Sequence, residues 1–158
     1  VEVVYARSFY AGSGHASGPL SGEFIGILAG PNPAEARAGL AAALQLMKED
    51  ACFYTADEKG ELAFYAYTIS RSGSYLSKEA GVAEGTPLAY LIAPPLESTY
   101  GVDAALKAAE VKMALWYGPL SETNFGGALL TGSQSDCKAA AEAFKNAVLE
   151  VASRPRDY

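Results

Sequence analysis

The feature that most constrains this chain is a short pattern that occurs twice. An apolar strand ends in a glycine turn that leads into a helix, first at Gly26–Pro33 (GILAGPNP) and again at Ala128–Ser135 (ALLTGSQS). Gly30 matches Gly132, an offset of 132 − 30 = 102 residues. Upstream, the sequence VEVV at the start of the chain matches VKMA before the second copy. Because strand, turn and helix recur in the same order, we interpret the pattern as an internal duplication.

The helices after the two glycine turns carry apolar residues at three- and four-residue steps, which is typical of a helix with one buried face. Each such face has to cover a sheet or another helix. At an offset of 144 − 40 = 104 residues, three apolar positions of the first helix match three of the second: Leu40 with Phe144, Leu44 with Val148, and Met47 with Val151.

The remaining elements follow from residue types and turn signals. The residue pair Lys59-Gly60 predicts a hairpin turn, and Gly81 predicts the end of a short helix in GSYLSKEAG. The predicted strands are Val1–Phe9, Glu23–Ala29, Cys52–Thr55, Glu61–Ser70, Thr86–Ala93, Val111–Trp116 and Phe125–Thr131. The longer predicted helices run from Pro33 to about Asp50, over Val102–Glu110 and over Ser135–Ala152.

The duplication predicts an unequal division of the chain. Residues 51–158 contain a whole repeat, whereas residues 1–50 match only its second half. Two strands and one amphipathic helix cannot complete a core alone, so we expect roughly 60 further residues to belong to the first repeat. The sequence therefore resembles a fragment that begins inside its first domain.

Composition excludes several classes of protein. A net charge of −6 argues against nucleic-acid binding, which needs a basic surface. No apolar run reaches the roughly 18–20 residues that span a bilayer. Two cysteines, Cys52 and Cys137, are too few to build a disulfide-rich secreted fold and favour reduced thiols in a cytoplasmic protein. A single bridge between them, or oxidation of the pair, stays open.

The sequence offers no catalytic centre. It has no G-x-S-x-G motif, and its only histidine, His15, lies in a glycine-rich stretch without a recognisable partner. The segment GSGHASG lacks the Gly-Lys-Ser/Thr that phosphate-binding loops need. His15 and two distant cysteines do not make a zinc site. We predict that the protein is not an enzyme and requires neither a metal nor a cofactor.

Several motifs in one order resemble a known family. Residues 103–144 (DAALKAAEVKMALWYGPLSETNFGGALLTGSQSDCKAAAEAF) resemble the bacterial microcompartment (BMC) shell domain. The order of LAFYAYTIS, GSYLS and TPLAYLIAPPLESTYGVDAALKAA resembles its circularly permuted, tandem-domain type. Together with GPNPAEARAGL, SRSGSYLS and PLSETN, these motifs resemble the shell proteins of ethanolamine utilisation over all 158 residues.

This resemblance implies an α/β fold in which helices cover an antiparallel sheet. It implies residues 1–50 as the C-terminal half of a first BMC domain and residues 51–158 as a complete second one. Three subunits would form a flat pseudohexameric tile, joined to other shell proteins around a cytoplasmic microcompartment and pierced by gated pores. The alternative hypothesis is an α/β domain of similar layout that senses a small molecule and builds no shell.

In the shell-domain pattern, two loops between strands face pores. Here they are SFYAGSGHASGPLS in the first repeat and YGPLSETN in the second. The glycines of the longer loop, among them Gly12 and Gly14, permit large backbone rearrangement. The resemblance therefore implies a gate, with Phe9 and Tyr10 as candidates to plug it. A flexible hairpin tip is the simpler alternative.

The resemblance also implies small-pore ligands on or near Phe53, Glu97 and Thr123, and the carboxylate of Glu122 is a further candidate for the same site. We expect Glu97 and Glu122 to lie in loops. Ethanolamine suits such a site, because its ammonium group pairs with a carboxylate and an aromatic face. Cobalamin, a larger cofactor used inside such compartments, is a second candidate ligand. Exposed loop carboxylates without a ligand are the alternative.

Lys107 matches the lysine that shell domains place at tile edges. Its spacing from Asp103 also predicts an exposed ion pair within one helix, worth about 0.3–0.5 kcal/mol. The two roles are compatible.

Overall fold

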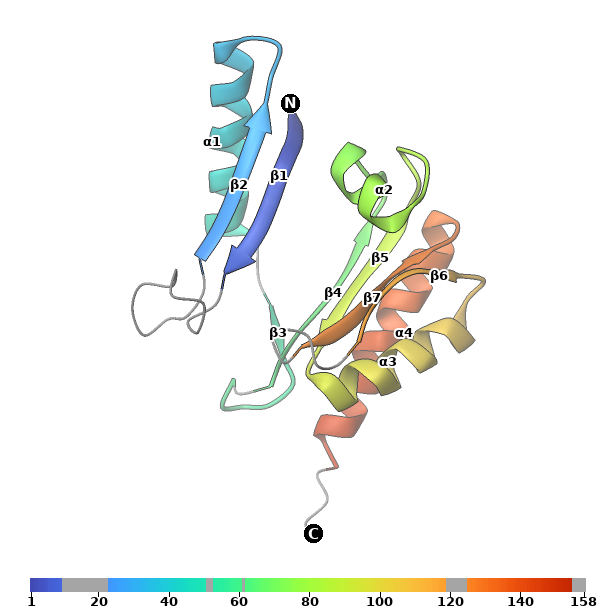
Figure 1. Ribbon diagram of the computed structural model, residues 1–158. Helices are drawn as coiled ribbons and strands as arrows, with labels where there is room; N and C mark the ends of the chain where they lie inside the picture. Colours follow the sequence, from blue (N-terminus) through green and yellow to red (C-terminus); the bar gives the residue numbers. More distant parts are fainter. Residues whose placement is uncertain (10–22, 51–52, 61, 119–124, 155–158) are drawn as a thin grey trace. The chain divides into compact units, whose positions relative to one another are not determined.

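The computed structural model describes residues 1–9, 23–50, 53–60, 62–118 and 125–154. The chain divides into two compact units (Figure 1). Unit 1 comprises Val1–Cys52 and Gly73–Tyr75, and unit 2 comprises Phe53–Ser72 and Leu76–Tyr158.

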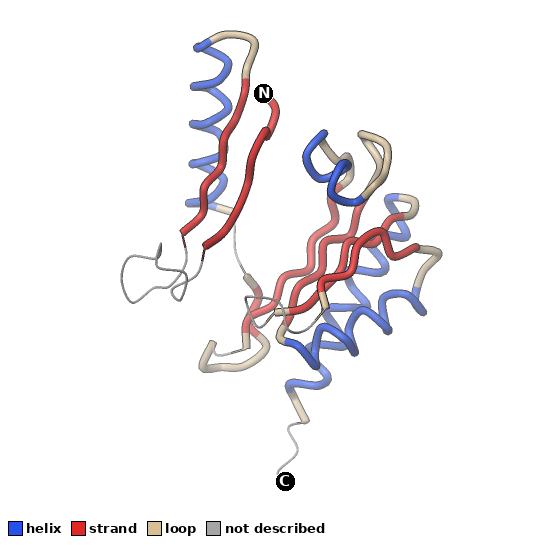
Figure 2. The backbone as a smooth tube through the Cα atoms, viewed as in Figure 1, coloured by secondary structure: helices blue, strands red, loops and turns tan. Residues whose placement is uncertain are grey.

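Unit 1 is built from two antiparallel strands and one long helix (Figure 2). Strand β1 (Glu2–Phe9) pairs with β2 (Glu23–Ala29), and helix α1 (Pro33–Glu49) follows. The Asn32 side chain caps α1 by accepting a hydrogen bond from the backbone N–H of Glu35. Pro33 occupies the first turn, where its missing N–H leaves no helical bond unmade.

Unit 2 is a five-stranded antiparallel sheet with two helices on one face (Figure 1). The strand order is β3-β4-β5-β7-β6. The strands are β3 (Tyr54–Thr55), β4 (Ala63–Ile69), β5 (Leu88–Ala93), β6 (Lys112–Tyr117) and β7 (Gly126–Thr131). The helices are α2 (Ser74–Ala80), α3 (Pro95–Ala108) and α4 (Gln134–Ala152).

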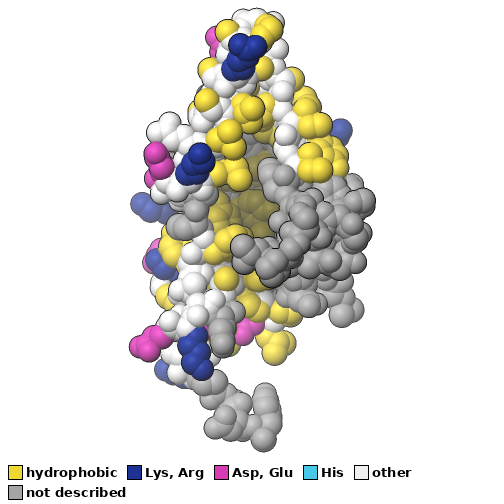
Figure 3. All heavy atoms as spheres, turned by 90° about the vertical axis from the view of Figure 1, so that its left-hand side faces the viewer, with side chains coloured by type: hydrophobic (Ala, Val, Ile, Leu, Met, Phe, Trp, Pro, Cys, Tyr) yellow, Lys and Arg dark blue, Asp and Glu magenta, His cyan; other side chains and the backbone are white. Residues whose placement is uncertain are grey.

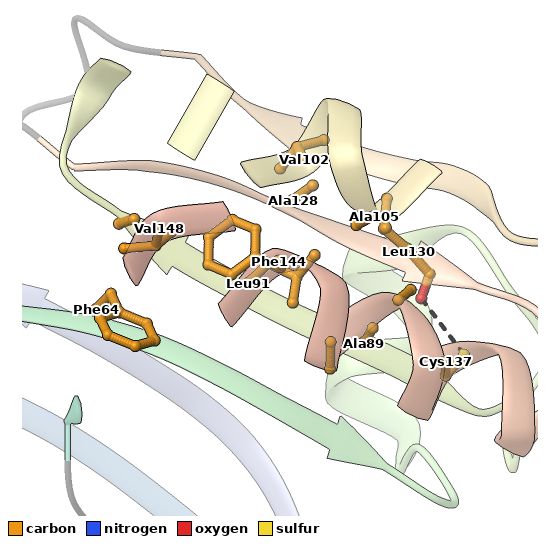
Figure 4. Close-up of a cluster of buried hydrophobic side chains, with 13 residues drawn as sticks. Phe64, Ala89, Leu91, Val102, Ala105, Ala128, Leu130, Cys137, Phe144 and Val148 are labelled. Atoms are coloured by element: carbon orange, nitrogen blue, oxygen red, sulfur yellow. Dashed lines mark hydrogen bonds between the residues drawn. The ribbon is translucent and has the colours of Figure 1, made fainter. Parts of the chain in front are cut away.

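The central strands of unit 2 are buried on both faces. Successive residues point to opposite faces of a strand. In β7, Leu130 packs in the cluster beneath α3 and α4, and its neighbour Leu129 packs with Leu88 and Ala80 on the other face. Figure 4 shows the first cluster, in which Phe144 of α4 lies among side chains of the sheet and α3. This sandwich holds α3 in place.

The predicted elements occur in the predicted order, with some bounds shifted. Gly81 ends α2 with a φ of 65°, which confirms the predicted glycine cap. The hairpin between β3 and β4 is also present, although Cys52 and Glu61 lie outside the described residues. The strand predicted from Thr86 begins at Leu88.

One boundary was wrong in a way that matters for function. The helix predicted over Val102–Glu110 begins instead at Pro95. The strand predicted over Thr86–Ala93 ends just before Pro94 and Pro95. Pro95 instead starts the helix, because proline is well tolerated in a first helical turn.

The two copies of the repeat share their strand register. In unit 1, Val3 pairs with Leu28, and the register then shifts before Tyr5 pairs with Ile27. The second copy shifts at the corresponding place: Met113 pairs with Leu130, and Leu115 pairs with Leu129. A shared irregularity at matching positions is independent structural support for the duplication.

The helix caps correct the predicted offset between α1 and α4. Asn32 caps α1 and Ser133 caps α4, an offset of 133 − 32 = 101 residues instead of 104. At this offset each buried residue of α4 matches an apolar residue or glycine of α1. The pairs are Cys137 with Ala36, Ala140 with Gly39, Ala141 with Leu40, Phe144 with Ala43, Ala147 with Leu46, and Val148 with Met47.

Candidate functional site

Glu97 lies in the first turn of α3, not in a loop as predicted. It is half-buried, and a carboxylate at this end of a helix is favoured by the positive end of the helix dipole. The neighbouring Ser98 and Thr99 hydroxyls both donate to the Pro95 carbonyl at 2.9 Å. The backbone that carries Glu97 is therefore a well-ordered helix start, which fixes the direction of its side chain more firmly than a loop would.

Phe53 is exposed and belongs to an aromatic cluster. It is 62% exposed, and its ring centroid lies 5.7 Å from that of Tyr65. Tyr65 in turn stacks on Tyr67 at 6.0 Å and meets Tyr90 edge-on at 5.8 Å. Aromatic ring faces attract cations. The cluster therefore offers an exposed apolar surface that suits a small organic cation.

A cation already lies over a ring elsewhere in unit 2. The Lys145 Nζ of α4 is 5.0 Å from the centroid of the Tyr54 ring, which itself stacks on Phe64 at 5.4 Å. This contact joins the C-terminal helix to the short edge strand β3. It stabilises the fold and occupies a different ring from those around Phe53.

The other predicted pore residues cannot be compared with the geometry. Glu122, Thr123, Tyr10, Gly12 and Gly14 lie outside the described residues. The backbone of Phe9 ends β1, and its side chain lies outside the described part. The pore loops therefore stay predictions from the sequence.

Lys107 and Asp103 form the predicted ion pair. The Lys107 Nζ lies 2.6 Å from the Asp103 carboxylate, and the two side chains are 73% and 58% exposed. Two residues that the sequence analysis missed, Leu96 and Tyr100, lie on the same helix and are also exposed. The signal that could have found them is the Pro-Pro pair, interpreted as a helix start.

Cys137 is a free and fully buried thiol. Its Sγ lies 4.0 Å from the Leu130 carbonyl oxygen, and burial raises the pKa of the thiol. A buried, protonated thiol is a poor nucleophile. In the described part of the chain no group of three His, Cys, Asp or Glu side chains could hold a metal ion. No helix in that part is long and apolar enough to cross a membrane.

The described residues of unit 1 leave the apolar face of α1 uncovered. No residue of α1 is buried, and Leu40 and Met47 are 51% and 56% exposed. Strand residues Ile25 and Ile27 of β2 are 45% and 51% exposed. In Figure 3, which faces the side of the chain on which α1 lies, hydrophobic side chains are among those exposed. Faces of this kind are typical of surfaces that another segment or subunit covers.

Comparison with solved structures defines the class of the fold. No protein-family model matches the chain. The trimeric bacterial microcompartment shell protein PduB superposes with a TM-score of 0.76 at 22% identity, over 96% of this chain and 66% of PduB. At this identity the likeness shows the fold alone. The fold is that of a BMC shell protein, as the sequence predicted.

Closer relatives define the family. The bacterial microcompartment shell protein EutL of Clostridium perfringens (strain 13 / Type A) is 60% identical over 158 residues, which cover 100% of this chain and 73% of the relative. The crystal structure of the ethanolamine utilization protein EutL from Leptotrichia buccalis C-1013-b superposes with a TM-score of 0.88 at 56% identity, over 99% of this chain and 72% of that one.

The chain belongs to the EutL family of bacterial microcompartment shell proteins. It is a structural component of the microcompartment shell of ethanolamine utilisation, in the bacterial cytoplasm, and it is not an enzyme. The predicted class of protein is confirmed.

Proposed function

We propose that this chain forms a flat homotrimeric tile in which each subunit supplies two BMC domains. The observation that carries this proposal is the β–β–α unit that occurs twice with the same register shift. Three chains with two such units each give six around one axis, which is the arrangement of a hexamer. The tile would join other shell proteins at its edges, with Lys107 among the contacts.

Within this proposal, residues 1–50 form the C-terminal half of a first BMC domain and residues 51–158 form a second, complete one. The two helices that end these segments support the assignment. Six residues of α4 are buried against the rest of unit 2, whereas none of α1 is buried. An α1 with the same apolar face fits a domain whose other elements lie outside residues 1–50.

The oligomeric state of the intact protein tests the tile. We expect light scattering after gel filtration to give the mass of a trimer, and electron microscopy to show discs with six similar lobes. Monomers whose stability rises with a small ligand would contradict the tile and favour a sensor domain.

We further propose that ethanolamine binds at Phe53, Glu97, Glu122 and Thr123. The exposed Phe53 ring and the half-buried Glu97 carboxylate support this, because an ammonium group favours both partners. Titration calorimetry of the intact protein measures the affinity. Glu97→Gln should weaken binding at least tenfold, whereas the exposed Glu142→Gln on α4 should leave it unchanged. Equal affinities for both variants would contradict the assignment of Glu97.

A gate is the last part of the proposal. Phe9, Tyr10, Gly12 and Gly14 would move between closed and open states of a central pore. Locking the loop at residues 11–22 with a cross-link should slow the exchange of large solutes across assembled shells more than that of small cations. Equal slowing of both would contradict the gate.

Cobalamin is proposed as a second ligand. Equilibrium dialysis of the intact protein measures its uptake, and absence of uptake would contradict cobalamin binding.

A further inference from the structure

Phe53 of the proposed ligand site comes directly before a very short edge strand. Strand β3 has two residues, of which Tyr54 pairs with Phe64 of β4. The Phe53 side chain is 62% exposed. An exposed side chain keeps its rotamer freedom unless a neighbour fixes it. The orientation of the Phe53 ring therefore depends on the side chains that it contacts.

Tyr65 of β4 lies across from Phe53. Because Tyr54 pairs with Phe64 in antiparallel register, the preceding residue, Phe53, comes opposite Tyr65. The two ring centroids are 5.7 Å apart and the ring planes are tilted by 58°, a geometry that aromatic pairs favour. Successive residues of a strand point to opposite faces, so both rings lie on the face away from Phe64 and the buried cluster of Figure 4.

Tyr65 is in turn supported by the core of unit 2. It is half-buried, and it meets the ring of Tyr90 edge-on, with centroids 5.8 Å apart and planes at 89°. Tyr90 packs against the second buried cluster, which contains Leu88 and Leu129. Contacts therefore run without a break from buried leucines through Tyr90 and Tyr65 to the exposed ring of Phe53.

The residue after Phe53 is held from the opposite face of the sheet. The Tyr54 ring stacks on Phe64 at 5.4 Å, and the Lys145 Nζ of α4 lies 5.0 Å from the centroid of the same ring. These contacts attach β3 to the sheet without Tyr65. We therefore expect a loss of the Tyr65 ring to change the orientation of the Phe53 side chain while β3 stays in place.

We propose that Tyr65 is a positioning residue of the ethanolamine site, because its ring holds the Phe53 ring with a face turned toward the ligand ammonium group. This inference rests on the ethanolamine site proposed above. The face of an aromatic ring is negative and attracts a cation, whereas its edge is positive. A freely rotating ring presents its edge for part of the time. Fixing the ring before the ligand arrives removes this ordering cost from the free energy of binding.

Removal of the Tyr65 ring tests this role by titration calorimetry of the intact protein with ethanolamine. Tyr65→Leu should weaken binding about three- to tenfold, which is the order of one aromatic pair. Tyr65→Phe keeps the ring and should bind within about twofold of the unmodified protein. Tyr67→Leu is the matched control, because Tyr67 stacks on Tyr65 one step further along β4, and it should bind within about twofold as well. Unchanged binding in Tyr65→Leu, or an equal loss in Tyr67→Leu, would overturn the assignment.

A double substitution separates positioning from a general loss of stability. In the Phe53→Leu protein no ring remains for Tyr65 to hold. Adding Tyr65→Leu to that variant should therefore weaken ethanolamine binding no further, because two residues that act through one contact have non-additive effects. Losses that add would mean that Tyr65 acts by another route than Phe53, and they would overturn the proposal.

A measurement without ligand keeps this role distinct from the ligand site itself. With 4-fluorophenylalanine in place of Phe53, the fluorine NMR resonance of the intact protein reports the surroundings of that ring. Tyr65→Leu should move the resonance toward that of the free amino acid, and Tyr67→Leu should not. An unmoved resonance in Tyr65→Leu overturns the positioning role whatever the protein binds. A resonance that moves, in a protein that binds no ethanolamine, would overturn the ligand site and still support the hold of Tyr65 on Phe53.

Discussion

The two copies of the β–β–α unit have the same local structure and very different burial. Both show the register shift in their first strand, and both cap the following helix with a polar side chain. Leu130 of β7 is nevertheless fully buried, whereas Leu28, at the matching position of β2, is only half-buried. The difference arises because β5 and α3 pack on the second copy, whereas the described residues of unit 1 supply no such strand and helix to the first.

This comparison separates two kinds of information in a sequence. Helix caps depend on residues within a few positions of one another, and the register shifts depend only on the two strands of each hairpin. Burial depends on what the rest of the chain, or another chain, brings alongside. Matching substitutions in the two copies therefore measure the contribution of the neighbours at constant local structure.

The matched leucines should show the largest difference. Leu130→Ala leaves a cavity in the core beneath α3 and α4, so we expect a loss of about 2–5 kcal/mol in the free energy of unfolding. Leu28→Ala removes a side chain with fewer contacts and should cost less than half as much. Hydrogen exchange of the β7 and β2 amides measures the two effects separately. Equal losses would mean that unit 1 is covered as fully as unit 2.

A glycine of β7 should show the next largest effect. A Cβ on Gly127 would overlap the Leu91 carbonyl oxygen of β5 and approach the Leu91 carbonyl carbon to 2.9 Å. Gly127→Ala should therefore cost about 1–3 kcal/mol, which fluorescence of the only tryptophan, Trp116 in β6, can follow during urea unfolding. The matching residue of β2 is Ile25, which is 45% exposed. Ile25→Ala should be the milder change, and the reverse order would contradict the matched register.

The helix caps should behave alike in both copies. Asn32 accepts from the Glu35 N–H at 2.9 Å, and Ser133 accepts from the Asp136 N–H at 3.1 Å. Asn32→Ala and Ser133→Ala should each cost about 1 kcal/mol, because each leaves one N–H of the first turn without its partner. Amide exchange in the first turns of α1 and α4 measures the two losses. A difference of several-fold between the caps would show that burial affects even this local feature.

The sequence predicted what local patterns determine. The glycine cap at Gly81, the pair of Lys107 with Asp103, and the first-turn Pro33 all follow from residue types at short spacing, and all are present. The α/β class is what the family resemblance implies. These features need no knowledge of distant neighbours.

Other features could not be predicted in this way. A Pro-Pro pair serves equally as the end of a strand or the start of a helix, and the sequence pattern predicts a helix only from Val102. Glu97 is therefore predicted in a loop, whereas it lies in the first turn of α3. The offset of 104 between the long helices came from matching large apolar residues. At the offset of 101 that the caps give, matched residues differ in size, since Ala43 matches Phe144 and Leu40 matches Ala141. Periodicity alone cannot reveal a match between residues of unequal size. The exposed Leu96 became visible only with the correct helix start.

The smallest expected effect in the neutral pH range concerns Cys137, whose match in α1 is Ala36. Burial raises the pKa of the Cys137 thiol above its value in the unfolded chain, about 8.5. Below that pH both states hold the proton, and the thiol contributes no pH dependence. As the pH rises above it, the unfolded state loses the proton first, so the free energy of unfolding falls. Urea titrations between pH 7 and pH 9.5 should show this decline, and Cys137→Ala should reduce its slope. If the slope is unchanged, the decline arises from other groups, and burial in the core of unit 2 does not hold the Cys137 thiol protonated.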